Sequence, residues 1–382
     1  MTEAVYITAT AAALPNAPVA NEAIEDVLGR VGGRPSRARR LVLRSNGIET
    51  RHYAIDPATG APTHSNAQLT AEAVRALADD GVRLADIDCL VTGTSLPDQL
   101  MPGHGVMVHG ELGIPACEVV STAGICLAGL TALRYAWLAV RAGERRNAVA
   151  TGSELASAVM HARHFEAESA ARVAALEAHP EIAFDKDFLR WMLSDGAGAA
   201  LLQDAPCADR PSLRIDWIEL SSQAHVQPAC MYAGAEKHAD GTLTGWARHS
   251  PEQWARQSVF AVKQDVRQLN EQVVLQTLET PLRALLDRRR LRAEAIDWFL
   301  PHMSSAYFRQ PIADCLARIG LPIAAERWFT NLATRGNTGS ASIFIMLDEL
   351  RRSGRLQRGE RLLCFVPESG RFSSGFMHLT VV

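Results

Sequence analysis

The chain has 382 residues, of which 47% are hydrophobic and 21% charged. This composition is typical of a soluble globular protein that buries a large core. A formal net charge of -3 argues against a dedicated surface for nucleic acid or anionic membranes, since both partners call for a basic field. We therefore expect neither a nucleic-acid nor a membrane partner.

The cysteines and the amino terminus predict a cytoplasmic location. Seven cysteines are scattered along the chain without a C-x-x-C pair or zinc-type spacing, which is typical of a reducing compartment. No Lys or Arg precedes Arg30, so the start lacks the charged region of a secretory signal. The longest apolar run, 123–140, is interrupted by Arg134 and is not expected to span a bilayer.

In chain order, the first half reads as strands separated by helices. "AVYITAT" (4–10) predicts a first strand, and "LADIDCLVTGTS" (84–95) predicts a loop followed by a short apolar strand. The helix in "STAGICLAGLTALRYAWLAV" (121–140) is apolar on nearly every side, which indicates a helix buried at the centre. "RAGERRNAVATGSE" (141–154) predicts a turn and another buried strand.

The second half repeats this order. "RAEAIDWFLPHMS" (292–304) matches the strand at 84–95, a helix begins near Ser340, and "RLQRGERLLCFVPESG" (355–370) repeats the Gly-Glu-Arg turn and strand. Such a repeat predicts an α/β layered fold from two duplicated halves, 1–205 and 206–382. We expect mainly parallel sheets with the buried helices between them.

Two segments have no counterpart in this repeat. Residues 155–192 are charged and helix-prone, and we interpret them as an insertion that forms a cap. Residues 223–256 are polar and turn-rich, and we expect them to form one wall of a cleft, because loops of this length are usually functional or disordered.

Three side chains stand at equivalent ends of the predicted elements: Cys126, His302 and Asn337. A thiol at a helix amino terminus gains thiolate character, so we expect a lowered pKa for Cys126. Each residue also has an ordinary structural interpretation: a packed cysteine, a surface histidine, and an asparagine that suits a turn. Their joint occurrence at corresponding ends of a duplicated fold favours a catalytic site.

Several further stretches around these residues follow one another in the order found in a known family. They are "RSNGIETRHYA", "DIDCLVTGTSLPDQLMPGHGVMVHGELG", "NAVATGSELAS", "LSDGAGAALL", "FLPHMSS", "GNTGSASI" and "VPESGRFSSG". Over almost its full length the chain resembles the β-ketoacyl-acyl-carrier-protein synthase III group of the thiolase superfamily. The resemblance implies a homodimer of thiolase-like, five-layered αβαβα subunits. It implies that Cys126 accepts the acyl group, that His302 and Asn337 complete the triad, and that the N–H groups of Cys126 and Gly370 form the oxyanion hole. It also implies thioesters of acyl carrier protein or coenzyme A as substrates, and neither metal nor cofactor.

The chain departs from ordinary members after the histidine. They carry His-Gln-Ala-Asn and a nearby arginine, whereas this chain has His302-Met303-Ser304-Ser305. With "VPESGRF", these departures resemble the ketosynthases of dialkylresorcinol, flexirubin and aryl-polyene pathways, which join a β-ketoacyl thioester to a second, often α,β-unsaturated, acyl thioester and close a cyclohexane-1,3-dione. Such chemistry needs a base, for which His302 is the first candidate and Glu154 the second. Glu154 also has a structural interpretation as a strand-end anchor.

Other interpretations remain open at this stage. The chain can be an ordinary synthase III that condenses decarboxylatively with malonyl carrier protein, a non-condensing acyltransferase of the same fold, or a non-catalytic partner subunit, although such subunits generally lose the cysteine. The basic runs 34–44 and 288–292, together with Arg309, are candidates for docking an acidic carrier protein. His161 and His164 have metal-ligand spacing but no third ligand, so a solvated helix face is the favoured interpretation.

Overall fold

The computed structural model describes residues 4–36, 39–165 and 188–382. Their largest feature is a sheet of nine strands in the order β13-β14-β15-β8-β1-β7-β6-β4-β5. The bounds of these strands are β1 Tyr6–Ala13, β4 Cys89–Gly93, β5 Glu118–Thr122, β6 Ala148–Glu154, β7 Gly196–Gln203, β8 Leu213–Ser222, β13 Trp298–Pro301, β14 Arg361–Glu368 and β15 Ser373–Val381.

This sheet consists of two halves with the same internal order. They meet where β1 pairs with β8 over only two residue pairs, Tyr6 with Arg214 and Ile7 with Leu213. From that link the order is β1-β7-β6-β4-β5 on one side and β8-β15-β14-β13 on the other. A parallel bridge from Phe299 to Trp328 stands where β5 would have its counterpart. The predicted duplication is confirmed in the strand order, and the proposed boundary at 205/206 falls in the loop between β7 and β8.

The expectation of mainly parallel sheets is wrong. Only β4–β5, β4–β6 and β13–β14 pair in parallel, whereas β1–β7, β1–β8, β6–β7, β8–β15 and β14–β15 are antiparallel. The physical reason is visible at residues 369–372, since so short a connection between β14 and β15 can join only antiparallel neighbours.

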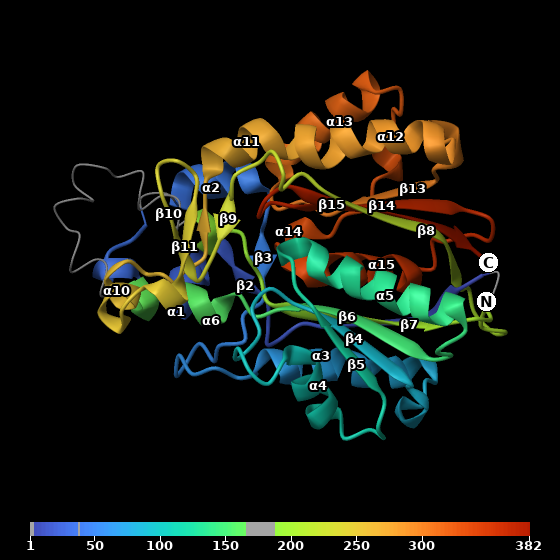
Figure 1. Cartoon of the computed structure of the whole chain (residues 1–382), viewed down its shortest axis with the longest axis horizontal. Coiled ribbons are helices and arrows are strands. Elements are labelled where there is room, and N and C mark those ends of the chain that lie inside the picture. Colours follow the sequence, from blue (N-terminus) through green and yellow to red (C-terminus); the bar gives the residue numbers. More distant parts are fainter. Residues whose placement is uncertain (1–3, 37–38, 166–187) are drawn as a thin grey trace.

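Helices cover both faces and fill the centre, which gives the five layers of the predicted αβαβα fold (Figure 1). α5 (Ala128–Ala142) and α15 (Ser342–Arg352) lie between the two halves of the sheet, α3 (Asn66–Arg75) and α4 (His104–Leu112) cover the β4–β7 half, and α11 (Val266–Val274), α12 (Thr280–Arg289) and α13 (Arg309–Arg318) cover the other. The remaining helices are α1 Ile24–Leu28, α2 Arg39–Asn46, α6 Ser157–Met160, α10 Pro251–Arg256 and α14 Leu332–Arg335, and a π-helical turn, η8 (Leu275–Glu279), joins α11 to α12.

The central layer explains the apolar run of the sequence. Within the described residues, Ile125–Ala142 is the one helical stretch with the length and composition of a membrane span. In the structure Leu130, Leu133 and Val140 are fully buried in the cluster between the sheet halves, whereas Leu138 on another face of the helix is exposed. This segment is therefore the core helix of the fold.

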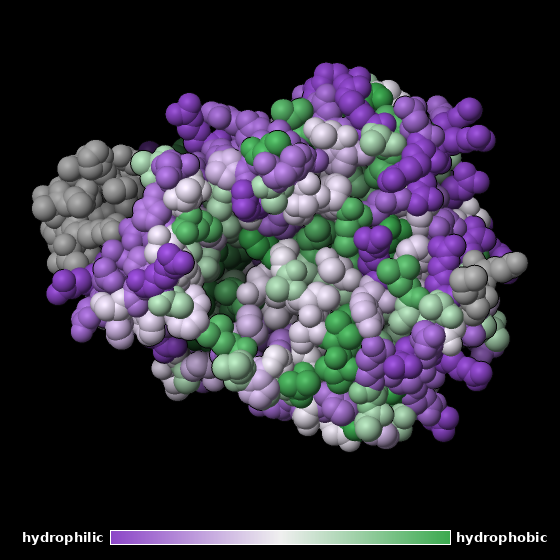
Figure 2. All heavy atoms as spheres, in the orientation of Figure 1, coloured by the Kyte–Doolittle hydropathy of each residue, from purple (hydrophilic) through white to green (hydrophobic). Residues whose placement is uncertain are grey.

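A smaller lobe lies beside the layers. It contains the two-stranded ladders β2 (Val19–Ala20) with β3 (Thr50–Arg51), β9 (Met231–Tyr232) with β12 (Lys263–Gln264), and β10 (Ala235–Lys237) with β11 (Leu243–Gly245). Figure 2 shows an apolar hollow between this lobe and the layered body, while hydrophilic residues dominate the periphery of the same face. Of the predicted cap, 155–192, residues 166–187 lie outside the described residues; the described ends contain α6.

Candidate active site

Cys126 lies where the chain enters the central helix. It occupies a 3-10 turn, η5 (Ile125–Leu127), directly before α5, and only 8% of it is exposed. Gly124 has φ 138° and Ile125 has φ 48°, a left-handed conformation that a β-branched residue rarely adopts. Strained backbone of this kind is held in place by surrounding structure and is typical of functional sites.

Small residues allow three elements to converge behind Cys126. A Cβ on Gly129 of α5 or on Gly152 of β6 would collide with the carbonyl oxygen of Ser340. Ser340 belongs to the turn η12 (Gly339–Ala341), which packs against η5, and its Oγ donates to the carbonyl of Ser153 at 2.8 Å. The glycines therefore hold the nucleophile turn, the end of β6 and η12 together.

His302 directly follows β13. Its backbone N–H donates to the carbonyl of Phe365 on β14 at 2.8 Å, and only 2% of the residue is exposed. Burial lowers the pKa of the imidazole to about 4, so the ring is neutral near pH 7. No described residue hydrogen-bonds its Nδ1.

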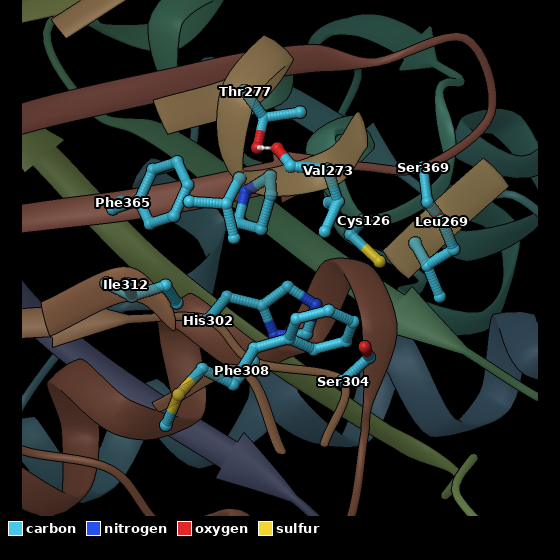
Figure 3. A pocket seen from close by; sticks show the side chains of 13 residues that line it. Cys126, Leu269, Val273, Thr277, His302, Ser304, Phe308, Ile312, Phe365 and Ser369 are labelled. Atoms are coloured by element: carbon cyan, nitrogen blue, oxygen red, sulfur yellow. Dashed lines mark hydrogen bonds between the residues drawn. The ribbon is translucent and has the colours of Figure 1, made fainter. Parts of the chain in front are cut away.

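Cys126 and His302 line one pocket (Figure 3). It contains about 450 Å³ of empty space, part of it open to solvent. α11 and η8 supply one wall, and the segment from η10 (Ala306–Phe308) to α13 supplies another. The remaining lining is mostly apolar: Leu269, Val273, Val274, Met303, Phe308, Ile312, Phe365 and Pro367, with Thr277, Ser304 and Ser369. Such a pocket suits an acyl chain.

Asn337 is not among the residues that line this pocket. It precedes η12 by two residues and is 3% exposed. Its Oδ1 accepts the N–H of Gly339 at 3.0 Å, which fixes the orientation of the amide. The Nδ2 group consequently lies on the side of the amide that is turned away from Gly339. It is a hydrogen-bond donor.

Glu154 is a buried carboxylate at the end of β6, with 6% exposed. Its Oε1 accepts from the backbone N–H of Ser95 at 3.1 Å and from the Ser95 hydroxyl at 2.8 Å. Burial raises the pKa of Glu154 to about 7, and the hydrogen bonds from Ser95 oppose that rise. The group can thus exchange a proton near neutral pH.

The predicted lowering of the Cys126 pKa is wrong for the resting protein. Burial raises the pKa of the thiol, and the charges of Glu154 and Glu368 raise it further; only its own backbone N–H acts in the other direction. The helix start is a real stabilising influence on a thiolate, but the loss of hydration is larger. Cys126 is therefore a thiol at rest.

Glu368 is the residue that sequence reasoning left without a role. It ends β14, is 6% exposed, and accepts the backbone N–H of Gly370, the group predicted to serve the oxyanion hole. The signal available in the sequence was a carboxylate two residues before that glycine in "VPESGRF". The Gly370 N–H is thus already engaged in the resting structure.

Two further predictions concern the cleft wall at 223–256 and the metal-ligand spacing of two histidines. The wall opposite Cys126 comes from α11 and η8, and no residue of 223–256 lines the pocket. Among the residues that the structure describes, no group of three or more His, Cys, Asp or Glu side chains could hold a metal ion, and His161 and His164 belong to no such group.

Comparisons with known proteins show which sequences and folds this chain resembles. Residues 286–375 match the family described as 3-oxoacyl-[acyl-carrier-protein] synthase III C terminal. The chain is 28% identical to a β-ketoacyl-[acyl-carrier-protein] synthase III of Rhodospirillum rubrum, covering 84% of this chain and 85% of that protein, and 26% identical to one of Sphingopyxis alaskensis over the full length of both. The solved structure of AbyA1, a tetronic acid condensing enzyme, shares the fold with a TM-score of 0.76 at 24% identity, covering 98% of this chain and 99% of that one. The chain is accordingly an acyltransferase similar to the condensing enzymes named β-ketoacyl-acyl-carrier-protein synthase III, and it has a thiolase-like fold.

Proposed function

We propose that the protein joins a β-ketoacyl thioester to a second, α,β-unsaturated acyl thioester and closes a cyclohexane-1,3-dione ring, the precursor of a dialkylresorcinol. The observation that carries this proposal is the apolar pocket shared by Cys126 and His302. The altered residues after His302 and the buried carboxylates near Cys126 support a second substrate other than malonyl carrier protein.

In the first half-reaction Cys126 becomes the acyl carrier. Its thiolate attacks the thioester carbonyl, the tetrahedral intermediate collapses, and the departing thiolate takes up the proton that Cys126 lost. The apolar side chains from α11 and α13 surround the acyl chain during this transfer. The product is an acyl-Cys126 thioester at the floor of the pocket.

In the second half-reaction two neutral donors stabilise the attacking enolate. His302 stays neutral near pH 7 because burial lowers its pKa to about 4, so it donates a hydrogen bond without giving up its proton. Asn337 supplies the second donor through Nδ2, with its carbonyl held by Gly339. Both donate to the thioester carbonyl of the β-ketoacyl substrate, whose α-carbon becomes the nucleophile.

A base distinguishes this chemistry from the ordinary reaction of a synthase III. A malonyl thioester forms its carbanion by losing carbon dioxide, whereas a β-ketoacyl thioester must lose a proton from carbon. A neutral imidazole with a pKa of about 4 is a weak base for that step, while Glu154, with a pKa of about 7, is matched to it. Because the charge of Glu154 also acts on Cys126, we propose Glu154 as the proton acceptor and His302 as the donor.

We further propose that the substrates arrive on acyl carrier protein at the face formed by α2 and η10, which pack together beside the pocket. Arg40, Arg44 and Arg309 are exposed there. The alternative run at 288–292 is less suitable, because Arg288 and Arg289 are both paired with Glu219. An acidic carrier protein would meet the α2–η10 face beside the pocket opening.

A homodimer in the cytoplasm completes the proposal. β5 is the edge strand of the nine-stranded sheet, and the exposed apolar side chains of Leu100, Met101 and Val106 lie before and within the neighbouring α4. An edge of this kind is a template for pairing with a second copy. The seven cysteines are all unpaired thiols, which fits a reducing compartment.

The deciding experiment incubates the purified protein with a β-ketoacyl thioester and an enoyl thioester in the absence of any malonyl donor. The proposal predicts a cyclohexane-1,3-dione, detected by mass spectrometry, and its loss in Cys126→Ala. Product formed only with a malonyl donor and with release of carbon dioxide would identify an ordinary synthase III. Transfer of the acyl group to an oxygen or nitrogen nucleophile, without a new carbon–carbon bond, would identify a non-condensing acyltransferase.

A further inference from the structure

The turn that joins β14 to β15 is organised around the carboxylate of Glu368. This carboxylate accepts the backbone N–H groups of Gly370, of Arg371 at 3.5 Å and of Ser373 at 3.0 Å. The flanking residues Pro367 and Ser369 line the pocket that contains Cys126. The Glu368 carboxylate is thus held by backbone hydrogen bonds beside the pocket that contains the Cys126 thiol.

The position of Gly370 leaves no room for a different side chain. An added Cβ would overlap Glu368 Oε1 and come within 2.7 Å of Ile125 Cδ1, the residue before the nucleophile. Gly370 is therefore wedged between the Glu368 carboxylate and the η5 turn. Whatever binds the Gly370 N–H does so close to the turn that carries Cys126.

No cation within the described residues neutralises Glu368. Arg371 in the same turn sends its Nε to the carbonyl of Gln227 at 2.9 Å. The titratable groups on which the charge of Glu368 acts are the thiols of Cys126 on η5 and of Cys230 before β9. Neither thiol carries a positive charge, so the partners of Glu368 are the backbone N–H groups of the turn and the Ser373 side chain.

This arrangement conflicts with catalysis unless it changes. An oxyanion hole works when preorganised N–H donors face the developing negative charge. An ionised carboxylate that already occupies one of these donors excludes the carbonyl oxygen and repels the oxyanion. A neutral acid accepts a weaker hydrogen bond, since the charge-assisted bond to a carboxylate is about twice as strong.

We propose that Glu368 is a gate on the oxyanion hole: as a carboxylate it holds the Gly370 N–H, and as a neutral acid it releases that N–H to the thioester carbonyl of the first substrate. Glu368 acts through Gly370 and is a positioning residue. This inference rests on the proposed function, because it concerns the acylation of Cys126.

The gate depends on the protonation of a buried carboxyl group. Burial raises the pKa of Glu368, and its backbone hydrogen bonds lower it by less. The neutral acid therefore persists to higher pH than for an ordinary glutamate. As the pH rises through that pKa, the open fraction falls.

Two reactions of the same thiol separate the gate from the reactivity of Cys126 itself. Alkylation by iodoacetamide needs the Cys126 thiolate but no oxyanion hole, whereas acylation by octanoyl-N-acetylcysteamine needs both. The rate of each is followed by mass spectrometry of the peptide that contains Cys126. The ratio of the acylation rate to the alkylation rate is measured from pH 5.5 to 9. Because both rates depend on the Cys126 thiolate, this ratio depends on the oxyanion hole alone.

The gate predicts that this ratio falls in the wild type by about tenfold per pH unit above the pKa of Glu368, as the neutral fraction does. In Glu368→Ala the ratio becomes independent of pH and equals or exceeds the wild-type maximum. In Glu368→Gln, which keeps an acceptor for the turn but cannot be protonated, the ratio is also independent of pH. Glu326→Gln, which removes an exposed carboxylate that does not line the pocket, keeps the wild-type fall.

Three results would overturn the gate. The first is a ratio that does not vary with pH in the wild type. The second is the same pH trend in Glu368→Gln as in the wild type, and the third is a lower ratio in a Glu368→Ala protein that unfolds at the wild-type temperature. If Cys126 is alkylated but is never acylated by any thioester in any variant, the proposed function fails and the gate fails with it.

Discussion

Alanine in place of Gly152 tests the close approach of β6 to η12 on which the site geometry depends. The added Cβ would meet Phe344 Cε2 at 2.9 Å and overlap the carbonyl group of Ser340, and both of these residues are fully buried. Overpacking of this kind costs about 1–3 kcal/mol in the free energy of unfolding. Because backbone is among the colliding atoms, we expect the upper part of that range.

The same substitution has a functional consequence. η12 must move away from β6, and with it the segment from Asn337 to Ser340 that packs on η5. We expect slower acylation of Cys126 together with a lower midpoint of thermal unfolding.

Gly110 provides a matched control for this substitution. It lies in α4, is exposed, and an added Cβ there meets nothing within 4 Å. Gly110→Ala should raise stability by about 0.5–1 kcal/mol, because alanine is favoured over glycine within a helix. A Gly152→Ala protein that unfolds at or above the wild-type temperature and is acylated at the wild-type rate would refute the packing described for this site.

Three other predictions follow from the pocket and its surroundings. Glu154 has a pKa of about 7, so condensation on the acylated enzyme should accelerate as the pH rises through about 7, and Glu154→Gln should remove that rise; a rise that persists in the variant contradicts the assignment. Ile312→Trp fills the pocket and should reduce acylation by octanoyl relative to acetyl thioesters by roughly tenfold, whereas Leu275→Trp, at an exposed position outside the lining, should leave that ratio unchanged. Arg44→Glu should raise the KM for carrier-borne substrate by about tenfold at low salt, while Arg358→Glu, in the loop before β14, should not; equal effects would place the docking face elsewhere.

Much of the fold could be predicted because the repeat is visible in the sequence. The strand at 84–95 and its match at 292–304 correspond to β4 and β13, and the two central helices are α5 and α15. Strand direction could not be predicted in the same way. A run such as "GAGAALL" in β7 is buried on both faces, which is typical of parallel strands, yet β7 pairs antiparallel with β1 and β6.

The sequence indicated that Cys126 and His302 lie together, but it did not predict the electrostatics around them. That Cys126 and His302 meet in one pocket follows from their positions at corresponding ends of the repeat. The direction of the Cys126 pKa depends on burial and on Glu154 and Glu368, which are distant in the sequence, so a local argument from the helix start gave the wrong sign. The contact between Glu368 and Gly370 depends on the conformation of one short turn, which residue types alone do not determine.

The elements that form the wall of the pocket could not be predicted from the sequence either. Residues 269–277 reach Cys126 only because α11 and η8 cover that half of the sheet, and η8 is a π-helical turn that no sequence pattern indicated. The polar segment 223–256 was the more visible candidate, but it contributes to the smaller lobe and contacts the 368–373 turn through Cys230, whose N–H donates to the Gly370 carbonyl at 2.7 Å.

The most direct test of the central claim is to identify the acylated residue. The protein is exposed to an acyl thioester, digested, and every cysteine-containing peptide is examined by mass spectrometry. An acyl-Cys126 intermediate predicts one adduct, on the peptide with Cys126, that disappears in Cys126→Ala. An adduct of the same yield that persists in Cys126→Ala, or that lies on another cysteine, would contradict the account.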